Sequence, residues 1–376
     1  MTYFNYSTFW PDGWWSQRSF LRAWWSIYAG DPRWVPPDYA AMKWLTLRSA
    51  SPLWHEGRAQ PLYLEALPRR SRAGNSALGQ PLLAGAVFEE AVAATILQYA
   101  PQHAGGTAYL GLLHCVNDEE VLERLLYTAF ETASTIGCAR IVGPVGVLPA
   151  WESGALTSHF HMIPPLHTPY NPPYLPDLLA SVMTPVLETA LYDLPVGANE
   201  GAAPGPAQLE PLRLVQLDGA LLPLLKAALM PHADVHDIVP DEIEILRRWL
   251  GAWPATGWLA KVDDEAVGFV FAQPERAALM RSARGGRRLP LRLYRLWGRW
   301  RPVIRGRLLL GAVAPGWQRR GIGGQLLRQL LSDARNAGWK SVACGPFALG
   351  SAAAQMMERF GAQSAQRYHL YEWSAW

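Results

Sequence analysis

Apolar and polar residues alternate along the chain in two periods, one typical of strands and one of helices. The period-two runs predict strands at 62–67, 82–87, 108–116, 140–142, 191–194, 212–217, 258–262, 266–271, 308–313, 340–344 and 367–373. The helical spacing predicts helices at 20–28, 117–136, 178–183, 221–230, 240–250, 325–337 and 352–359. Strands and helices that alternate in this way predict an α/β protein.

One stretch of the chain places a strand, a glycine-rich turn and a helix in that order. Leu308–Val313 is apolar, Pro315-Gly316 predicts a turn, and the sequence from Gln318 to Gly324 leads into the helix. The residues expected to form the buried stripe of that helix are Leu326, Leu327, Leu330, Leu331 and Ala334. Glycines let a backbone approach a ligand closely, and the first amides of a helix are unpaired donors. The stretch therefore predicts a pyrophosphate site, with a glycine-rich helix cap that binds nothing as the alternative.

The spacing of the glycines narrows the choice of phosphate ligand. A Walker loop would end in Gly-Lys-Ser/Thr, and a dinucleotide fingerprint would have a third glycine where Leu326 stands. The remaining pattern, Q-x-x-G-x-G from Gln318, resembles the acetyl-coenzyme A loop of the GNAT superfamily of N-acyltransferases. The resemblance implies that the cofactor is acetyl-CoA or a longer acyl-CoA. The residues it implies for cofactor binding are Ala312, Val313, Gln318, Arg319, Arg320, Gly321, Ile322, Gly323 and Gly324.

The two halves of the chain repeat a common pattern. Leu125, Leu126, Ala133 and Gly137 match Leu326, Leu327, Ala334 and Gly338 at one constant offset. The strands that follow end in Gly143-Pro144 and Gly345-Pro346. In the last strands of the two halves, Tyr192-Asp193-Leu194 corresponds to Tyr371-Glu372-Trp373. We therefore predict two similarly folded αβ halves.

The repeat also predicts a difference between the halves. At the same offset, Asn117 to Leu122 stand where the second half has Gln318 to Gly323, without a glycine and with acidic residues at 118, 119 and 120. Carboxylates at these positions would repel a pyrophosphate. Only the second half is expected to bind the cofactor.

Other segments extend the resemblance over nearly the whole chain. They are Trp34-Val35-Pro36-Pro37, Gly143-Pro144, Tyr170-Asn171-Pro172-Pro173-Tyr174 and the basic insertion 276–307. Together they resemble a bacterial family of tandem GNAT-like proteins. The resemblance implies two tandem acyltransferase domains with mixed sheets flanked by helices. The expected boundaries are 1–194 for a domain without an acyl-CoA loop, 195–210 for a linker rich in Ala, Gly and Pro, and 211–376 for the domain that carries the loop.

Acyl transfer to an amine needs a base for the amine and an acid for the departing thiolate. The resemblance implies a carboxylate on or near the strand before the loop and a tyrosine in the last helix. Leu308–Val313 contains no acid, and Met357 stands where the tyrosine is expected. The catalytic residues stay unassigned, and the candidate replacements are Tyr368, Tyr371, Glu372, Tyr170 and Tyr174. Strand alternation places Tyr368 and Tyr371 on opposite faces.

The insertion 276–307 contains a second candidate site. From Leu289 to Trp300, apolar residues fall on one helical face and Arg288, Arg292, Arg295 and Arg299 on another. This pattern predicts an amphipathic basic helix. It could cover the sheet, bind an anionic small molecule, or, less favoured, lie on a membrane surface or nucleic acid.

Composition restricts the remaining classes of function. The chain has 376 residues, 50% hydrophobic and 17% charged, and a formal net charge of +3, too small by itself to indicate a nucleic-acid-binding protein. Cys115, Cys138 and Cys344 are too few and too scattered for a disulfide framework. His159, His161 and His167 lack neighbouring ligands at metal-site spacings, so no metal is expected.

These observations favour an N-acetyltransferase that moves an acyl group from acetyl-CoA to the amine of a small molecule or peptide. The alternative is a degenerate acyltransferase fold that binds acyl-CoA without turnover, as a sensor or interaction module. No nucleic-acid partner is expected. The N-terminus lacks a basic start before an apolar run, so a cytoplasmic location is expected. The acceptor, the acyl chain length and the oligomeric state stay open.

Overall fold

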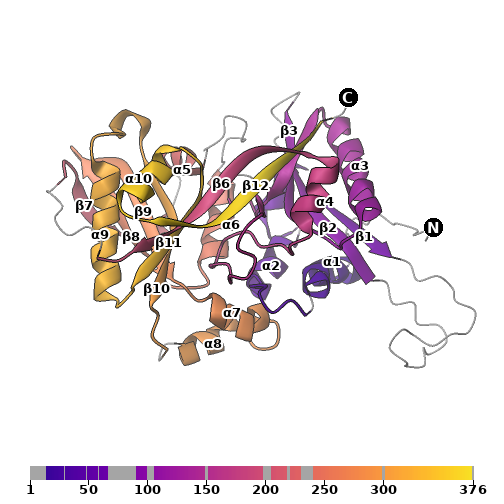
Figure 1. The fold of residues 1–376 in the computed structure, drawn as a ribbon, viewed down its shortest axis with the longest axis horizontal. Coiled ribbons are helices and arrows are strands. Elements are labelled where there is room, and N and C mark those ends of the chain that lie inside the picture. The colour runs from indigo at the N-terminus through magenta and orange to yellow at the C-terminus, as the bar shows by residue number, and fades with distance from the viewer. Residues whose placement is uncertain are drawn as a thin grey trace, which may run out of the picture.

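The fold is taken from a computed structural model, shown in Figure 1. It describes residues 14–374 except 29, 48, 58, 67–89, 100–105, 149–150, 198–204, 218–220, 230–239 and 299–300. Within this part of the chain, no helix is long and apolar enough to cross a membrane. The strand expected at 82–87 lies outside the described residues.

The elements of the first half begin with two helices. In chain order they are α1 (Trp14–Ile27), α2 (Tyr39–Leu45), η1 (Pro52–Gly57), β1 (Ala59–Ala66), β2 (Glu90–Tyr99), β3 (Thr107–Cys115), α3 (Glu119–Thr135), β4 (Arg140–Val145), β5 (Ala155–Leu156), α4 (Leu175–Val182) and β6 (Thr184–Pro195). The β2 strand was not predicted, because alanines supply much of its apolar pattern and have low strand propensity.

The second half repeats this order and adds two helices before its central strand. Its elements are β7 (Gln208–Leu212), η2 (Leu214–Gln216), α5 (Leu222–Leu229), α6 (Pro240–Leu250), β8 (Thr256–Val262), β9 (Glu265–Pro274), α7 (Ala277–Ser282), η4 (Arg284–Gly286), α8 (Leu291–Gly298), β10 (Arg305–Val313), η5 (Pro315–Trp317), α9 (Ile322–Asn336), β11 (Ser341–Ala348), α10 (Ala352–Arg359) and β12 (Gln363–Ser374).

A twelve-stranded sheet runs through the described residues of both halves (Figure 1). Its order is β1-β2-β3-β4-β12-β6-β11-β10-β9-β8-β7, and β5 pairs with β12. The halves exchange their last strands. β12, from the second half, pairs with β4, whereas β6, from the first half, pairs with β11. Since β6 and β12 also pair antiparallel with each other, the two exchanged strands join the halves at the centre of the sheet.

The repeat predicted from the sequence is present in the structure. In each half a central strand pairs parallel with the strand that follows its helix, β3 with β4 and β10 with β11. Gly137 and Gly338 end the matching helices α3 and α9 with φ of 82° and 77°, a conformation that favours glycine. The two matching Gly-Pro peptide bonds, before Pro144 and Pro346, are both cis. The α/β fold with two tandem halves is confirmed.

Helices cover both faces of the sheet. Alternate side chains of β9 pack into the cores on its two faces. Val270 packs in a core with α9 and α10, whereas Phe269 and Phe271 pack in a core shared by α1, α2, α5 and α6. Helices α3 and α4 cover the first half's part of the sheet. The core formed by α1, α2, α5 and α6 contains residues of both halves, so it packs the halves together as well as covering the sheet.

One predicted strand and the bounds of the predicted linker differ from the structure. The strand expected at 212–217 is wrong, because β7 ends at Leu212 and residues 214–216 form a 3-10 turn. The expected linker 195–210 overlaps β6 at Pro195 and β7 from Gln208. The segment has few bulky residues, so its pattern did not predict β7. This strand contains Pro211 and lies at the edge of the sheet, where proline is tolerated.

The basic insertion forms a helix, but with a different buried side from the one expected. In α8, Leu291 packs with Met280 of α7, and it is 8% exposed. Leu289, Leu293 and Leu296, which were expected to lie on its apolar face, are 42%, 38% and 55% exposed. Leu291 and Tyr294, which lie outside the apolar face expected from the sequence, supply the contacts to α7 and η4.

Candidate functional site

The predicted cofactor turn lies between β10 and α9, where a left-handed glycine starts the helix. Gly321 is the N-cap of α9 with φ of 86°, and no side chain caps its amides. Gln318 donates from Nε2 to the carbonyl oxygen of Val313 at 3.2 Å, and this bond holds the turn against the end of β10. The first amides of α9 therefore have no partner within the helix. The turn residues Gln318 to Gly321 are exposed.

The space around the glycines fits a pyrophosphate. A Cβ at Gly321 would meet nothing within 4 Å, so the surface over the first amides of α9 is open. At Gly323 a Cβ would come 3.4 Å from Met356 Sδ and 3.6 Å from Val313 Cγ2. The guanidinium of Arg320 stacks over Trp317, 4.7 Å from the ring centroid, and leaves a cation beside the turn. Backbone donors, a helix dipole and an arginine are the groups that bind phosphates.

The matching turn in the first half is closed by its own side chain. Asp118 is the N-cap of α3, and its Oδ1 accepts from the amides of Glu120 at 3.0 Å and Val121 at 3.3 Å. These are amides that the second half leaves open. The carboxylate both occupies the donors and adds negative charge, so the first-half turn does not fit a phosphate.

A buried arginine marks the point where the strands below the cofactor turn separate. β10 and β11 pair only from Arg305–Ser341 to Arg307–Ala343. The Arg307 side chain donates to the carbonyl oxygen of Ala343 at 3.2 Å and to that of Gly345. It also donates to the carbonyl oxygens of Leu166 at 2.9 Å and His167 at 3.0 Å, which belong to a first-half loop. Burial lowers the pKa of Arg307, and the surrounding carbonyls compensate the guanidinium.

Two of the candidate tyrosines lie in the protein core. Tyr368 is 0% exposed, and its hydroxyl donates to Gln366 Oε1 at 3.2 Å. Tyr371 is 2% exposed and donates to the carbonyl oxygen of Pro176 at 3.3 Å. They pack in separate core clusters, as expected for residues on opposite faces of β12. Neighbouring Glu372 lies 3.3 Å from Arg140 in an ion pair.

The other two candidate tyrosines, Tyr170 and Tyr174, use their hydroxyl groups to hold the first-half loop in which they lie. The Tyr170 hydroxyl donates to Asp31, and burial followed by that carboxylate raises its pKa. Tyr174 donates to the carbonyl oxygen of Cys115 at 2.9 Å, and burial raises its pKa to about 12. Of the four tyrosines, Tyr170 lines a cavity. In the last helix, Met357 is 1% exposed and packs beneath α9.

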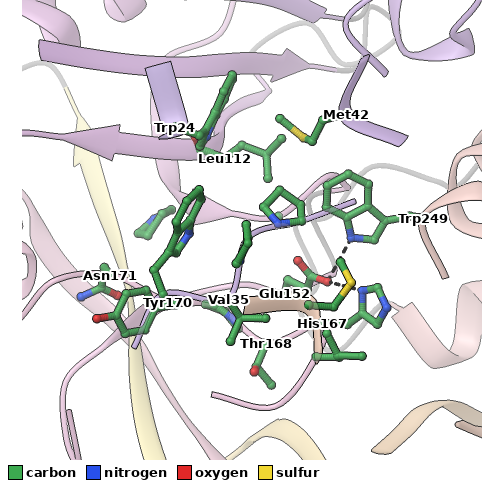
Figure 2. Close-up of a pocket in the computed structure, with 18 of the residues that line it drawn as sticks. Trp24, Val35, Met42, Leu112, Glu152, His167, Thr168, Tyr170, Asn171 and Trp249 are labelled. Atoms are coloured by element: carbon green, nitrogen blue, oxygen red, sulfur yellow. Dashed lines mark hydrogen bonds and ion pairs between the residues drawn. The ribbon is translucent and has the colours of Figure 1, made fainter. Parts of the chain in front are cut away.

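A cavity of about 130 Å³ lies in the first half at the place where β3 and β4 separate (Figure 2). Its wall is mainly apolar and aromatic, with residues of α1, β3 and the loop around Tyr170 from the first half. Trp249, Trp253 and Met280 complete it from the second half. Sequence analysis did not predict this cavity, because residues far apart in the chain form it.

Glu152 and His167 lie in contact at one end of the cavity, where Figure 2 shows Glu152 between Trp249 and His167. Glu152 Oε1 lies 3.2 Å from His167 Nδ1, and each side chain is 11% exposed. The same oxygen accepts from the indole N–H groups of Trp151 at 3.0 Å and Trp249 at 3.1 Å. From its sequence context, His167 was considered only as a metal ligand, and no metal is expected there. The described residues contain no group of three or more metal-binding side chains.

Residues 225–362, which include the turn, match the acetyltransferase (GNAT) family model. No curated protein matches the chain in sequence.

Solved structures with a similar fold include a tandem GNAT protein. One is a tandem GNAT protein of the clavulanic acid biosynthesis pathway, with a TM-score of 0.55 and 13% identity over 99% of this chain and 98% of that one. A conserved Enterococcus faecalis protein, a probable N-acyltransferase, has a TM-score of 0.54 and 8% identity over 99% and 73%. A glucosamine N-acetyltransferase region of a fungal multi-domain β-N-acetylglucosaminidase has a TM-score of 0.54 and 11% identity, over 99% of this chain and 38% of that one.

These likenesses show the fold of the whole chain, and the family match covers its second half. Residues 225–362 therefore resemble the acetyltransferase (GNAT) family in sequence, and the whole chain has a fold similar to that of a tandem GNAT protein.

Proposed function

We propose that this protein is an N-acetyltransferase that transfers the acyl group of acetyl-CoA, or of a longer acyl-CoA, to an amine. The observation that carries the proposal is the open N-terminus of α9 behind Gly321, next to the self-capped N-terminus of α3 behind Asp118. Bound acyl-CoA supplies an activated thioester. The amides from Gln318 to Gly324 would hold its pyrophosphate, and Ala312 and Val313 would lie along its acyl arm.

The chain also has donors for the thioester carbonyl. Beyond Arg307, β10 no longer pairs with β11, so its amides on that edge have no ladder partner there. Such amides can bind a carbonyl oxygen.

Calorimetry with acetyl-CoA tests the first step. Gly323→Glu adds a carboxylate to the first turn of α9 at a position with ordinary van der Waals space. We expect it to weaken binding at least tenfold, whereas Gly323→Ala leaves binding of the same order. Gly316→Glu is the matched charge control, because a side chain there meets nothing within 4 Å and lies outside α9. Absence of acetyl-CoA binding to the parent protein would disprove the proposal.

A second candidate is a protein that binds acyl-CoA without turnover. The buried Met357 in the last helix favours it, because that side chain cannot protonate a thiolate. Thiol release over a panel of amines separates the two functions. Release above the rate of buffer hydrolysis supports the enzyme, and acetyl-CoA binding without release from any amine supports the binding protein.

A further inference from the structure

The cavity at β3 and β4 favours a cationic ligand over an anionic one. Two of its lining residues, Asp38 and Glu152, are carboxylates, and no lysine or arginine is among the described residues that line it. The rest of the wall is mainly apolar and aromatic. Aromatic faces attract organic ammonium groups, and carboxylates do the same.

Most polar groups on the wall already have partners in the protein. Asn171 donates to the carbonyl oxygen of Leu156 and accepts from the Leu156 amide at 2.6 Å. His114 Nδ1 lies 2.6 Å from the Tyr28 hydroxyl. These groups fix the shape of the cavity and are not available to a ligand.

Two polar atoms on the wall differ from the others. His167 Nε2 and Trp253 Nε1 are buried and have no hydrogen-bond partner among the described residues. A buried polar atom without a partner costs roughly 1–3 kcal/mol, so such atoms indicate a missing ligand or water. Here they belong to two residues that line one cavity.

Glu152 determines which ring nitrogen of His167 carries the hydrogen. Its Oε1 accepts from two indole N–H groups, and a carboxylate oxygen of this kind cannot donate. His167 Nδ1, 3.2 Å away, must therefore carry the hydrogen. Nε2 of the neutral ring is then a lone pair, and the carboxylate behind it stabilises the ring when Nε2 takes a proton.

The second half holds His167 near the strands of the cofactor domain. Arg307 of β10 donates to the carbonyl oxygens of Leu166 and His167. Glu275, which directly follows β9, accepts from the Leu166 amide at 2.9 Å. These bonds join the loop to the point where β10 and β11 separate. Since β10 leads directly to the cofactor turn, the backbone that carries the His167 side chain is anchored to the strand along which the acyl arm is expected.

We propose that the cavity binds a compact, mainly apolar primary amine as the acyl acceptor, and that His167 Nε2 takes the proton of its ammonium group. This inference rests on the proposed function. The volume of about 130 Å³ is close to that of a cavity that holds benzene, which sets the size of the apolar part. The ammonium N–H bond breaks, its proton moves to Nε2, and its electron pair becomes the nitrogen lone pair that attacks the acyl carbon. As the C–N bond forms, the C–S bond of the thioester breaks and its electron pair leaves with the thiolate. The second nitrogen proton passes to that thiolate, which gives the thiol, and His167 returns its proton to solvent.

Benzylamine is the probe, measured by calorimetry with the full chain in the absence of acetyl-CoA. We expect saturable one-to-one binding, at least tenfold tighter than that of benzyl alcohol and tighter again than that of benzoate. His167→Phe keeps a ring of similar size and should weaken benzylamine binding at least tenfold. His161→Phe is the matched control, because His161 is exposed in the same loop and should leave binding unchanged.

A second variant tests the proton arrangement without any activity measurement. In Glu152→Gln the amide N–H₂ can face Nδ1, which would then lose its hydrogen and leave Nε2 as the donor. Nitrogen-15 NMR should show the Nδ1–H form of His167 in the parent protein and the Nε2–H form in the variant. Benzylamine binding should fall in the variant while its unfolding temperature stays above the assay temperature.

The results separate this inference from the proposed function. If acetyl-CoA binds but benzylamine does not bind, or binds equally to His167→Phe, the inference is wrong and the proposed function stands. If benzylamine binds and acetyl-CoA does not, the proposed function fails. The cavity is then an amine site, but the amine is not an acyl acceptor. An Nε2–H form of His167 in the parent protein would exclude it as the proton acceptor.

Discussion

Arg307 should contribute far more to stability than its neighbours on the same strand. It is 2% exposed and donates to four carbonyl oxygens, those of Leu166, His167, Ala343 and Gly345. A hydrogen bond to a charged group contributes roughly 1.5–3 kcal/mol. The four bonds do not add in full, because burying the guanidinium has its own cost.

Arg307→Met removes all four donors and leaves the carbonyls buried. A buried acceptor left without its partner costs roughly 1–3 kcal/mol, and because four carbonyls are affected we expect a total loss of at least about 3 kcal/mol. Arg307→Lys keeps the charge but lacks the planar fork, so its loss should be intermediate. Arg305→Met is the control, because Arg305 is 25% exposed and pairs only with Asp193 among the described residues, at 3.1 Å. A partly exposed pair of this kind, screened by solvent, contributes about 1 kcal/mol.

Urea denaturation followed by tryptophan fluorescence and circular dichroism gives these values if the two transitions coincide. Hydrogen exchange at the amides of residues 164–168 gives an independent measure, since the loop should open locally when Arg307 is lost. Equal losses for Arg307→Met and Arg305→Met, or unchanged exchange in the loop, would refute the assignment of Arg307 as the anchor between the halves.

Three further predictions concern separate parts of the chain. Asp118→Ala removes the cap of α3 and should lower the free energy of unfolding by about 1 kcal/mol in urea titrations, and no loss would mean that water replaces the cap. Burial holds the pKa of His114 well below its usual value, so the unfolded chain binds the extra proton and stability should fall as pH drops below about 6.5, by at most ~1.4 kcal/mol per pH unit. His114→Phe should flatten this dependence, and an unchanged slope would assign it to other groups. Leu291→Ala should lower stability by about 2–4 kcal/mol and Leu293→Ala by less than about 0.5 kcal/mol, whereas the reverse order would contradict the buried side of α8.

The basic helix allows one more test. If the exposed leucines of α8 lie on a membrane surface, the protein should bind vesicles that contain anionic lipid, and changing Arg288, Arg292, Arg295 and Arg299 to Gln should abolish that binding. A parent protein that does not sediment with the vesicles would remove the membrane interpretation.

The cofactor turn was predictable because its chemistry lies in consecutive residues. Strand, glycines and helix follow one another from Leu308, and the buried stripe of Leu326, Leu327, Leu330, Leu331 and Ala334 is confirmed. The helix α6 (Pro240–Leu250) and the helix α10 (Ala352–Arg359) were predicted with these same bounds because each has a clear start signal and helical period.

The cavity was not predictable, because no local pattern specifies it. Glu152 and His167 are separated in sequence by β5 and a loop that contains Pro164 and Pro165, and the second half supplies Trp249 and Trp253. The sequence also could not show which tyrosines are buried. Half-buried and fully buried tyrosines have the same local pattern, and only packing distinguishes Tyr368 from Tyr170.

The exchanged strands β6 and β12 make the two halves interdependent. A chain that ended after β6 would lack the strand that pairs with β4, and a chain that began at β7 would lack the strand that pairs with β11. Each fragment would expose unpaired strand edges at the centre of its sheet, where aggregation starts. Cutting the connection between β6 and β7 in the folded protein should therefore leave the halves associated. In this respect the chain is built like a dimer of interlocked subunits whose ends were later joined, and its two halves must be kept, expressed and mutated as one unit.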